Sequence, residues 1–311
     1  MGKIAFVFPG QGAATVGMGQ ALIASDPAAA AVWQVVTAAL PQLDQLCREG
    51  PLERLVETVN AQPALFGVDC ACLAALQAAG VAPDVVAGHS LGEYAALVAA
   101  EALDVAAGLS LVRARAEAMQ RACARPGGML AVSGLTAEQV EAIVAAWNGD
   151  AVLAVANYNA PGQTVISGDA AAIRAIAPAF EQAGARVTEL VVGGAFHSPL
   201  MAPGEPEFWP ALAAAPFRDA RVPVVSNTTA RPATDAEVLR AALRSQMTGS
   251  VRWQQSVETL LALGVDTFVE VGPGRTLLGL IRRTVPREAR VRLLNVEDPP
   301  SLERTVAALR G

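Results

Sequence analysis

The feature that most constrains this fold is a serine between two glycines, in Gly-His-Ser-Leu-Gly at residues 88–92. The apolar run at 85–87 predicts a strand before it, and the Ala-rich residues 93–100 predict a helix after it. A serine in a sharp strand-to-helix turn is typical of a nucleophile, because the strained backbone requires neighbours that lack Cβ atoms. The helix amides would face the point where an oxyanion forms. The segment therefore predicts Ser90 as a nucleophile at the edge of an α/β sheet.

The overall composition limits the class of protein. With 311 residues, 53% hydrophobic and 17% charged, the chain is long enough for one large core or two domains. No uninterrupted apolar run approaches the roughly 18 residues that span a bilayer, and the first apolar run is too short for a signal peptide. A net charge of −6 argues against general nucleic-acid binding. We expect a cytoplasmic protein with no membrane or nucleic-acid partner.

The scarcity of certain residue types excludes several kinds of chemistry. Only two histidines occur, His89 and His197, too few for a histidine-rich zinc site. Lys3 is the only lysine, which argues against Schiff-base and Walker-type sites. The glycine turn at 10–12 lacks the third glycine of a dinucleotide fingerprint, because Thr15 stands there. We expect no metal, no cofactor and four reduced cysteines without C-x-x-C spacing: Cys47, Cys70, Cys72 and Cys123.

The order of predicted elements indicates an α/β fold in two parts. Strands and helices alternate through most of the chain, which predicts a mostly parallel sheet covered on both faces. Residues 129–192 instead predict the order strand, helix, strand, strand, helix, strand, which is typical of a ferredoxin-like unit. We expect an α/β-hydrolase-like catalytic domain at residues 1–126 and 194–311, with an inserted ferredoxin-like βαββαβ subdomain at residues 127–193.

Single residues predict where the helices of the inserted unit begin and end. Thr136 and Gln139 have the spacing of a capping box, Asp169 is a favourable N-cap, and Gly184 is a favourable helix stop. Pro178 lies inside the second predicted helix, so we expect that helix to be kinked or to start late.

A serine hydroxyl needs a general base, and the two histidines are the candidates. His89 is adjacent to Ser90, and neighbouring side chains on a tight turn diverge, so we expect His89 to support the turn. His197 follows a predicted strand, and loops at the carboxyl ends of strands are where α/β active sites form. We predict His197 as the base; the alternative is a histidine packed at a domain joint.

Six motifs occur in an order that resembles one family. They are Phe-Pro-Gly-Gln-Gly at 8–12, Gln-Pro-Ala-Leu at 62–65, Gly-His-Ser-Leu-Gly-Glu at 88–93, Ala-Arg-Ala-Glu-Ala-Met-Gln at 114–120, Gly-Ala-Phe-His-Ser at 194–198 and Glu-Val-Gly-Pro-Gly at 270–274. Together they resemble the malonyl-CoA:acyl carrier protein transacylases, the acyltransferase family of fatty acid and polyketide synthesis. The resemblance covers nearly the whole chain, and the inserted unit is also a trait of that family.

The resemblance implies roles for five residues in the reaction. Ser90 would accept the acyl group as an ester, with His197 as the base. The backbone amides of Gln11 and Leu91 would form the oxyanion hole, where each donor contributes about 3 kcal/mol to the transition state. Arg115 would bind the malonyl carboxylate through two parallel hydrogen bonds. Taken alone, an arginine on an amphipathic helix is more often solvated at the surface.

The resemblance also implies residues that line or support the acyl site. Gln62 would lie near it, and the backbone carbonyl of Gln246 would orient the histidine, which gives a Ser-His dyad without the acid of a triad. Phe196 is bulky, as in malonyl-selective members. Asn159 and Asn227 would line the cleft, and turn formation is the alternative for both.

These features predict transfer of a malonyl group from malonyl-CoA to the phosphopantetheine thiol of an acyl carrier protein, by a ping-pong mechanism through a malonyl-serine ester. Fatty acid synthesis is favoured. The alternatives are a free-standing acyltransferase of a polyketide pathway and a serine thioesterase or hydrolase. We expect a monomer. Five arginines are a candidate docking surface for an acidic carrier protein, or else a solvated helix end: Arg282, Arg283, Arg287, Arg290 and Arg292.

Overall fold

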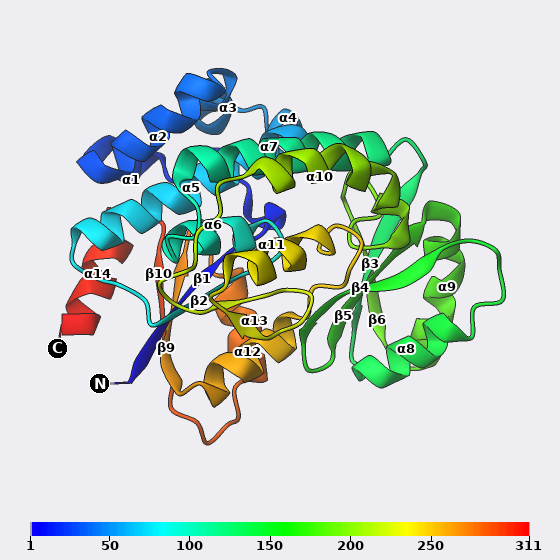
Figure 1. Cartoon of the computed structure of the whole chain (residues 1–311). Coiled ribbons are helices and arrows are strands. Elements are labelled where there is room, and N and C mark those ends of the chain that lie inside the picture. Colours follow the sequence, from blue (N-terminus) through cyan, green and yellow to red (C-terminus); the bar gives the residue numbers. More distant parts are fainter. Residues whose placement is uncertain (1, 311) are drawn as a thin grey trace.

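The computed structural model describes residues 2–310 and contains two sheets with helices packed around them (Figure 1). The larger sheet has the strand order β10-β9-β1-β2-β7-β8. Its neighbours pair in parallel, except that β7 and β8 are antiparallel. The mostly parallel sheet is thus confirmed. Its strands are β1 (Lys3–Phe8), β2 (Val85–Gly88), β7 (Val224–Val225), β8 (Pro232–Ala233), β9 (Val265–Val271) and β10 (Arg292–Val296).

Helices cover both faces of this sheet, as the pattern predicts. Along β1, Phe6 and Phe8 belong to one hydrophobic core, while Ala5 and Val7 belong to a second one. Alternate strand residues point to opposite faces, so each face has its own core. The helices of this part are α1 (Gln20–Ser25), α2 (Pro27–Ala39), α3 (Gln42–Glu49), α4 (Leu52–Leu55), α5 (Thr58–Ala78), α6 (Gly92–Ala99), α7 (Val105–Ala122), α10 (Glu205–Ala214), α11 (Ala236–Arg244), α12 (Trp253–Ala262), α13 (Thr276–Thr284) and α14 (Pro299–Arg310), with short 3-10 helices at Gln11–Ala13 and Pro199–Gly204.

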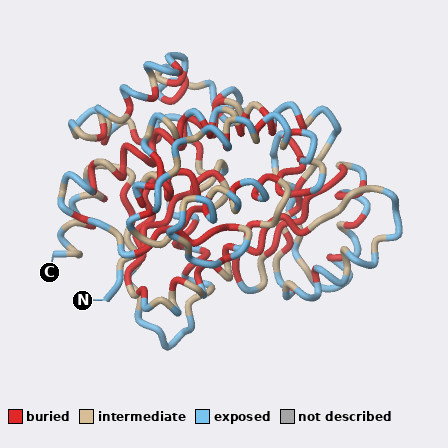
Figure 2. Tube along the Cα trace, in the orientation of Figure 1, coloured by how far each residue is buried: buried red, intermediate tan, exposed pale blue. Residues whose placement is uncertain are grey.

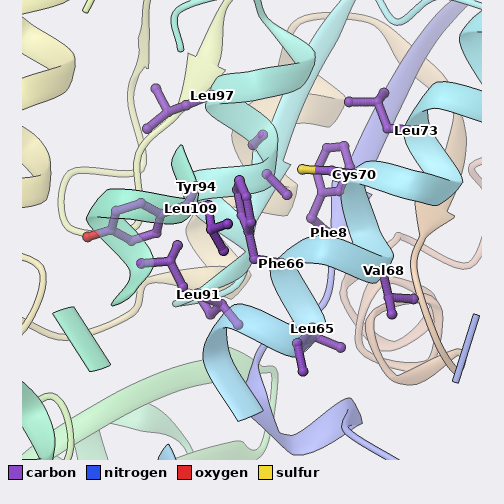
Figure 3. Close-up of a cluster of buried hydrophobic side chains, with 14 of the residues drawn as sticks. Phe8, Leu65, Phe66, Val68, Cys70, Leu73, Leu91, Tyr94, Leu97 and Leu109 are labelled. Carbon is purple, nitrogen blue, oxygen red and sulfur yellow. The ribbon is translucent and has the colours of Figure 1, made fainter. Parts of the chain in front are cut away.

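Helix α5 is the central helix of the larger core. Its Phe66 lies among the side chains of Phe8, Leu91 and Tyr94 (Figure 3). The helix is long and apolar enough to cross a membrane by length and composition, but 89% of its most apolar 18-residue window is buried inside the fold. Buried segments gather at the centre of the molecule, and the outer faces of the surrounding helices are exposed (Figure 2). The burial of α5 is typical of a core helix.

The second sheet is antiparallel and has the order β4-β5-β3-β6. Its strands are β3 (Gly127–Ser133), β4 (Leu153–Ala160), β5 (Gln163–Asp169) and β6 (Arg186–Leu190). Two helices, α8 (Ala137–Ala145) and α9 (Ala170–Gln182), cover one face and enclose a core that includes Leu130, Ile166 and Phe180. Met129 and Val165 belong instead to the core of the larger part. The strand and helix order predicted for a ferredoxin-like unit is confirmed.

The expected helix boundaries of this unit hold in part. Thr136 and Gln139 form the predicted capping box. Asp169 occupies the N-cap position of α9 but caps nothing, because its carboxylate accepts hydrogen bonds from the Arg125 guanidinium and the Val152 amide. Pro178 lies within α9, which begins at Ala170, so the helix does not start late, and the kink expected as the alternative stays a prediction.

Candidate active site

Ser90 occupies a strained turn between β2 and α6. Its φ is 54°, a left-handed conformation that non-glycine residues rarely adopt. A Cβ on Gly88 would lie 1.9 Å from the backbone of Gly92, and a Cβ on Gly92 would lie 2.1 Å from the carbonyl oxygen of Phe8. Both glycines are therefore required by space as well as by the turn, as the sequence pattern predicts. The turn holds the Ser90 hydroxyl at the carboxyl end of β2.

His197 contacts the Ser90 hydroxyl directly. Ser90 Oγ lies 2.7 Å from His197 Nε2, and His197 Nδ1 lies 3.0 Å from the carbonyl oxygen of Gln246 and 3.2 Å from that of Gly249. Carbonyl oxygens only accept hydrogen bonds, so Nδ1 carries the proton and Nε2 is free to accept from Ser90. The ring is thereby held in the tautomer that can remove the serine proton. Among residues 2–310, no carboxylate is bonded to Nδ1.

The surroundings of His197 keep its ring neutral. Burial, together with the positive charge of Arg115, lowers the pKa of His197 to about 3, against the two carbonyl hydrogen bonds that raise it. The unperturbed pKa of about 6.5 expected from the residue type alone therefore does not apply. A neutral imidazole is the form that a general base requires.

Arg115 is a buried cation in contact with the nucleophile. Only 1% of it is exposed, and its Nη2 donates to Ser90 Oγ at 3.1 Å while its Nη1 donates to Gln62 Oε1 at 2.7 Å. The guanidinium lies over the Tyr94 ring, 5.6 Å from its centroid. Within residues 2–310 no carboxylate forms an ion pair with it. A buried guanidinium without a counter-ion is suited to binding an anionic ligand.

The two amides expected in the oxyanion hole are available. Across the described residues, neither the Gln11 nor the Leu91 backbone N–H donates to a protein acceptor. The side chain of Gln11 is held by neighbours, since its Nε2 donates to Thr58 Oγ1 and its Oε1 accepts from Gln62 Nε2, both at 3.3 Å. These bonds fix the loop that carries the first amide.

These residues open into a cavity of about 690 Å³ between the two sheets. Of the residues predicted for the site, seven line it: Gln11, Gln62, Ser90, Arg115, Asn159, Phe196 and His197. Methionines and valines add apolar walls, including Met119 of α7, Met129 of β3 and Val165 of β5. Among residues 2–310, no three His, Cys, Asp or Glu side chains gather in a way that could hold a metal ion.

His89 and Asn159 form a polar pair on the cavity wall. His89 Nε2 lies 2.9 Å from Asn159 Oδ1, and the imidazole packs edge-on to the Trp253 ring with 5.7 Å between centroids. These contacts direct His89 away from the serine proton, in line with a supporting role. Asn157, two residues before Asn159 on β4, also lines the cavity and was not predicted.

Asn227 and Gln246 lie behind the turn and do not line the cavity. Asn227 Oδ1 accepts from the Ser90 backbone N–H at 2.6 Å, and Gln246 Nε2 donates to the Ser90 carbonyl at 2.9 Å. The buried carboxylate of Glu93 accepts hydrogen bonds from the Gln246 side chain and from the backbone N–H of Asn227. Burial raises the pKa of Glu93 to about 7, against the hydrogen bonds from Gln246 and Asn227 that lower it. Glu93 was not predicted as a site residue. Its position in the first turn of α6, directly after the turn that carries Ser90, could have indicated it.

Comparisons with known proteins find similar sequences and structures. Residues 5–300 match the family model of the acyl transferase domain. The chain is 39% identical, over 100% of its length and 98% of the relative's, to the malonyl CoA-acyl carrier protein transacylase of Bacillus subtilis. The acyl-carrier-protein-S-malonyltransferase of Bartonella henselae has a TM-score of 0.94 at 37% identity, with 100% of both chains covered. A malonyl-transacylase in complex with its type II PKS acyl-carrier protein has a TM-score of 0.94 at 34% identity, covering 98% of this chain and 99% of that one.

Proposed function

The chain belongs to the acyl transferase family, and we propose that it transfers a malonyl group from malonyl-CoA to the phosphopantetheine thiol of an acyl carrier protein. The observation that carries this proposal is the buried Arg115, which has no ion-pair partner within residues 2–310 and touches Ser90 Oγ beside His197. An acyl group that ends in a carboxylate gives that cation its partner. Transfer through a serine ester then needs only groups that the cavity supplies.

In the first half-reaction, Ser90 Oγ attacks the thioester carbonyl of malonyl-CoA while His197 Nε2 takes the hydroxyl proton. The carbonyl oxygen becomes an oxyanion, and the N–H groups of Gln11 and Leu91 donate to it. As the tetrahedral intermediate collapses, the carbon–sulfur bond breaks and the His197 imidazolium returns the proton to the CoA thiolate. The products are CoA and a malonyl ester on Ser90.

The second half-reaction uses the same groups in reverse. The carrier protein thiol loses its proton to His197 Nε2 and attacks the ester carbonyl, and the same two amides hold the oxyanion. The ester carbon–oxygen bond breaks, and Ser90 Oγ leaves with the proton from His197. The malonyl group is then a thioester of the carrier protein and the enzyme is restored.

The proposed substrate accounts for the composition of the cavity. Arg115 pairs with the malonyl carboxylate, and Gln62 holds the guanidinium in place through Nη1. Phe196 and Met119 supply apolar walls around the short acyl chain. Fatty acid synthesis is the favoured pathway, and a polyketide carrier protein is the alternative partner, for which the malonyl-transacylase solved with its type II PKS acyl-carrier protein is a precedent.

Other features of the proposal follow from the reaction. Nucleophile, base and oxyanion donors are all protein groups, so the reaction as written needs no cofactor or metal, and the CoA thioester is a substrate. Four free cysteines suit a reducing compartment, and we place the protein in the cytoplasm. We further propose that it acts as a monomer, because every group named in the two half-reactions comes from one chain.

The experiment that tests this function is intact-mass measurement after mixing the protein with malonyl-CoA. We expect the mass of one malonyl group to be added, to be absent in Ser90→Ala, and to move to a carrier protein supplied afterwards. An absent adduct, or one that survives Ser90→Ala, contradicts the mechanism. Release of the malonyl group to water at the rate of transfer would instead favour the hydrolase alternative.

A further inference from the structure

Glu93 has no part in the reaction described above, yet it bonds to Asn227 and Gln246, the two residues that hold Ser90 and His197 from outside the cavity. Its side chain is 2% exposed in the first turn of α6. Its Oε2 accepts a hydrogen bond from Gln246 Nε2 at 2.6 Å, and its Oε1 accepts one from the backbone N–H of Asn227 at 3.3 Å. Both oxygens act as acceptors, which suits the ionised carboxylate.

One arm of this network reaches the nucleophile. Asn227 Oδ1 accepts from the Ser90 N–H, and Asn227 Nδ2 donates to the Gly88 carbonyl at 2.5 Å. Gln246 Nε2 donates to the Ser90 carbonyl as well as to Glu93. The backbone of Ser90, strained at φ 54°, is therefore held on its N–H by the Asn227 side chain and on its C=O by the Gln246 side chain, and Glu93 accepts from the Asn227 backbone N–H and from the Gln246 side chain.

The other arm reaches the base. The backbone carbonyls of Gln246 and Gly249 accept from His197 Nδ1 at 3.0 Å and 3.2 Å, so the position of Gln246, the nearer acceptor, helps to set the tautomer and the tilt of the imidazole. The side chain of Gln246 is fixed by Glu93. A displaced Gln246 would therefore shift the acceptor of Nδ1 and lengthen the contact between His197 and Ser90.

We propose that the Glu93 carboxylate is a positioning residue for the Ser90–His197 pair, acting on the histidine through Gln246 and on the serine through Asn227 and Gln246. The inference rests on the proposed function. In a catalytic triad the acid bonds directly to Nδ1 of the histidine. Here the Glu93 carboxylate acts on His197 indirectly, through Gln246. A purely structural carboxylate would stabilise the fold and leave the reactivity of Ser90 unchanged.

The first test compares Glu93→Gln with a matched variant, Glu270→Gln. Glutamine has the same shape but replaces one acceptor by an NH₂ group, so one of the two bonds to Glu93 is lost. Glu270 is also fully buried and also accepts two hydrogen bonds, from the backbone N–H groups of Leu277 and Leu278, but it contacts neither Ser90 nor His197. Stability is followed by thermal unfolding in both.

The probe is phenylmethanesulfonyl fluoride, which needs the nucleophile and the base but no malonyl site, together with single-turnover malonylation. We expect Glu93→Gln to slow both reactions at least about tenfold, with KM for malonyl-CoA within about twofold of the wild type. Glu270→Gln should lose stability and keep both rates within about twofold. If only malonylation fails in the wild type, the proposed function is wrong while the positioning role survives.

A spectroscopic readout separates positioning from structure. The chain has two histidines, so ¹⁵N NMR resolves the His197 ring, and the wild type should show a single tautomer protonated at Nδ1. We expect Glu93→Gln to give a mixture of tautomers.

A second variant guards against misfolding of the first. Gln246→Leu removes the bonds from Nε2 to Glu93 and to the Ser90 carbonyl and keeps the backbone carbonyl that faces His197, so it should slow the sulfonylation of Ser90 at least as much as Glu93→Gln does. The double variant should be at most about twofold slower than Gln246→Leu alone, because Gln246→Leu already removes the bond between Glu93 and Gln246. Wild-type rates in Glu93→Gln, equal slowing in Glu270→Gln, an unchanged tautomer, or additive effects would each overturn the proposal.

Discussion

Arg115 Nη2 donates to Ser90 Oγ at 3.1 Å, so the cation proposed to bind the substrate carboxylate touches the nucleophile itself. If Arg115 binds the acyl carboxylate, as proposed, that carboxylate would lie beside the reacting serine. A malonyl group would then be distinguished from an acetyl group, because an acetyl group would leave this buried charge without a partner.

We predict that Arg115→Ala reverses the acyl preference. The kcat/KM for malonyl-CoA should fall at least about 100-fold, since each charge-assisted hydrogen bond contributes about 1.5–3 kcal/mol. The kcat/KM for acetyl-CoA should fall much less. Intact-mass competition between the two thioesters measures the ratio of acyl-enzymes. Arg113→Ala is the matched control, because Arg113 lies on the same helix in an exposed pair with Glu117. A ratio that stays at the wild-type value would remove Arg115 from this role.

A second prediction concerns the protonation of His197. Burial and the charge of Arg115 lower its pKa to about 3, so the neutral base is present above that pH and is lost only as the pH falls through it. NMR titration from pH 8 to pH 5 should therefore show no protonation of the His197 ring. The ring itself is the right observable, because Glu93, with a pKa of about 7, can affect the rate in the same range.

The same titration in Arg115→Ala supplies the control. Removing the positive charge should raise the pKa of His197, and burial should still hold it below the ordinary value of about 6.5. A midpoint between pH 6 and pH 7 in the wild type would show that the ring is solvated and would contradict the buried base.

The nucleophile turn and the inserted unit could be read from the sequence because their causes are local. The glycines around Ser90 are required by contacts within a few residues and with β1, and the capping box from Thr136 to Gln139 is a four-residue pattern. Helix α10 was not predicted, because Pro206 and Pro210 are unfavourable in helices. Pro206 lies in the first turn, where its missing N–H costs nothing.

The supporting network could not be read from the sequence. Asn227 is 137 residues from Ser90 and follows the two-residue strand β7 by two residues, and a strand so short has no periodicity to reveal it. Its placement on the cleft wall, implied by family resemblance, differs from its observed place behind the turn. The low pKa of His197 likewise depends on burial, which only the packed structure determines.

A third prediction tests the space around the turn. Gly92→Ala would place a Cβ 2.1 Å from the Phe8 carbonyl oxygen, so either β1 or the turn that carries Ser90 must move. We expect a loss of about 1–3 kcal/mol in unfolding free energy, as for other overpacked sites, and at least tenfold slower acylation of Ser90.

The matched control is Gly279→Ala, in the exposed middle of α13, where no atom lies within 4 Å of the added Cβ. That change should stabilise the protein by up to about 1 kcal/mol, because alanine is the better helix former. Chemical denaturation measures both variants. A Gly92→Ala protein with wild-type stability and rate would show that the turn is not as tightly enclosed as the contacts indicate.

The last prediction concerns the carrier protein. Helix α13 lines the cavity with Thr276, Leu277 and Leu280, and its last turn carries Arg282 and Arg283. At 1.5 Å per residue, the two arginines lie about 3–5 Å along the helix from Leu280. An acidic partner that delivers its thiol to Ser90 could therefore contact them.

We expect the double change Arg282→Glu and Arg283→Glu to raise KM for the carrier protein at least about tenfold and to leave acylation by malonyl-CoA within about twofold. The effect should shrink as salt is added, because exposed charges are screened. The double change Arg174→Glu and Arg186→Glu, at two exposed positions of the inserted unit, is the charge-matched control. Each half-reaction is measured by itself, with intact mass for acylation and transfer to carrier protein for the second step. Equal slowing of both steps would show that the arginines support the fold and do not bind the carrier protein.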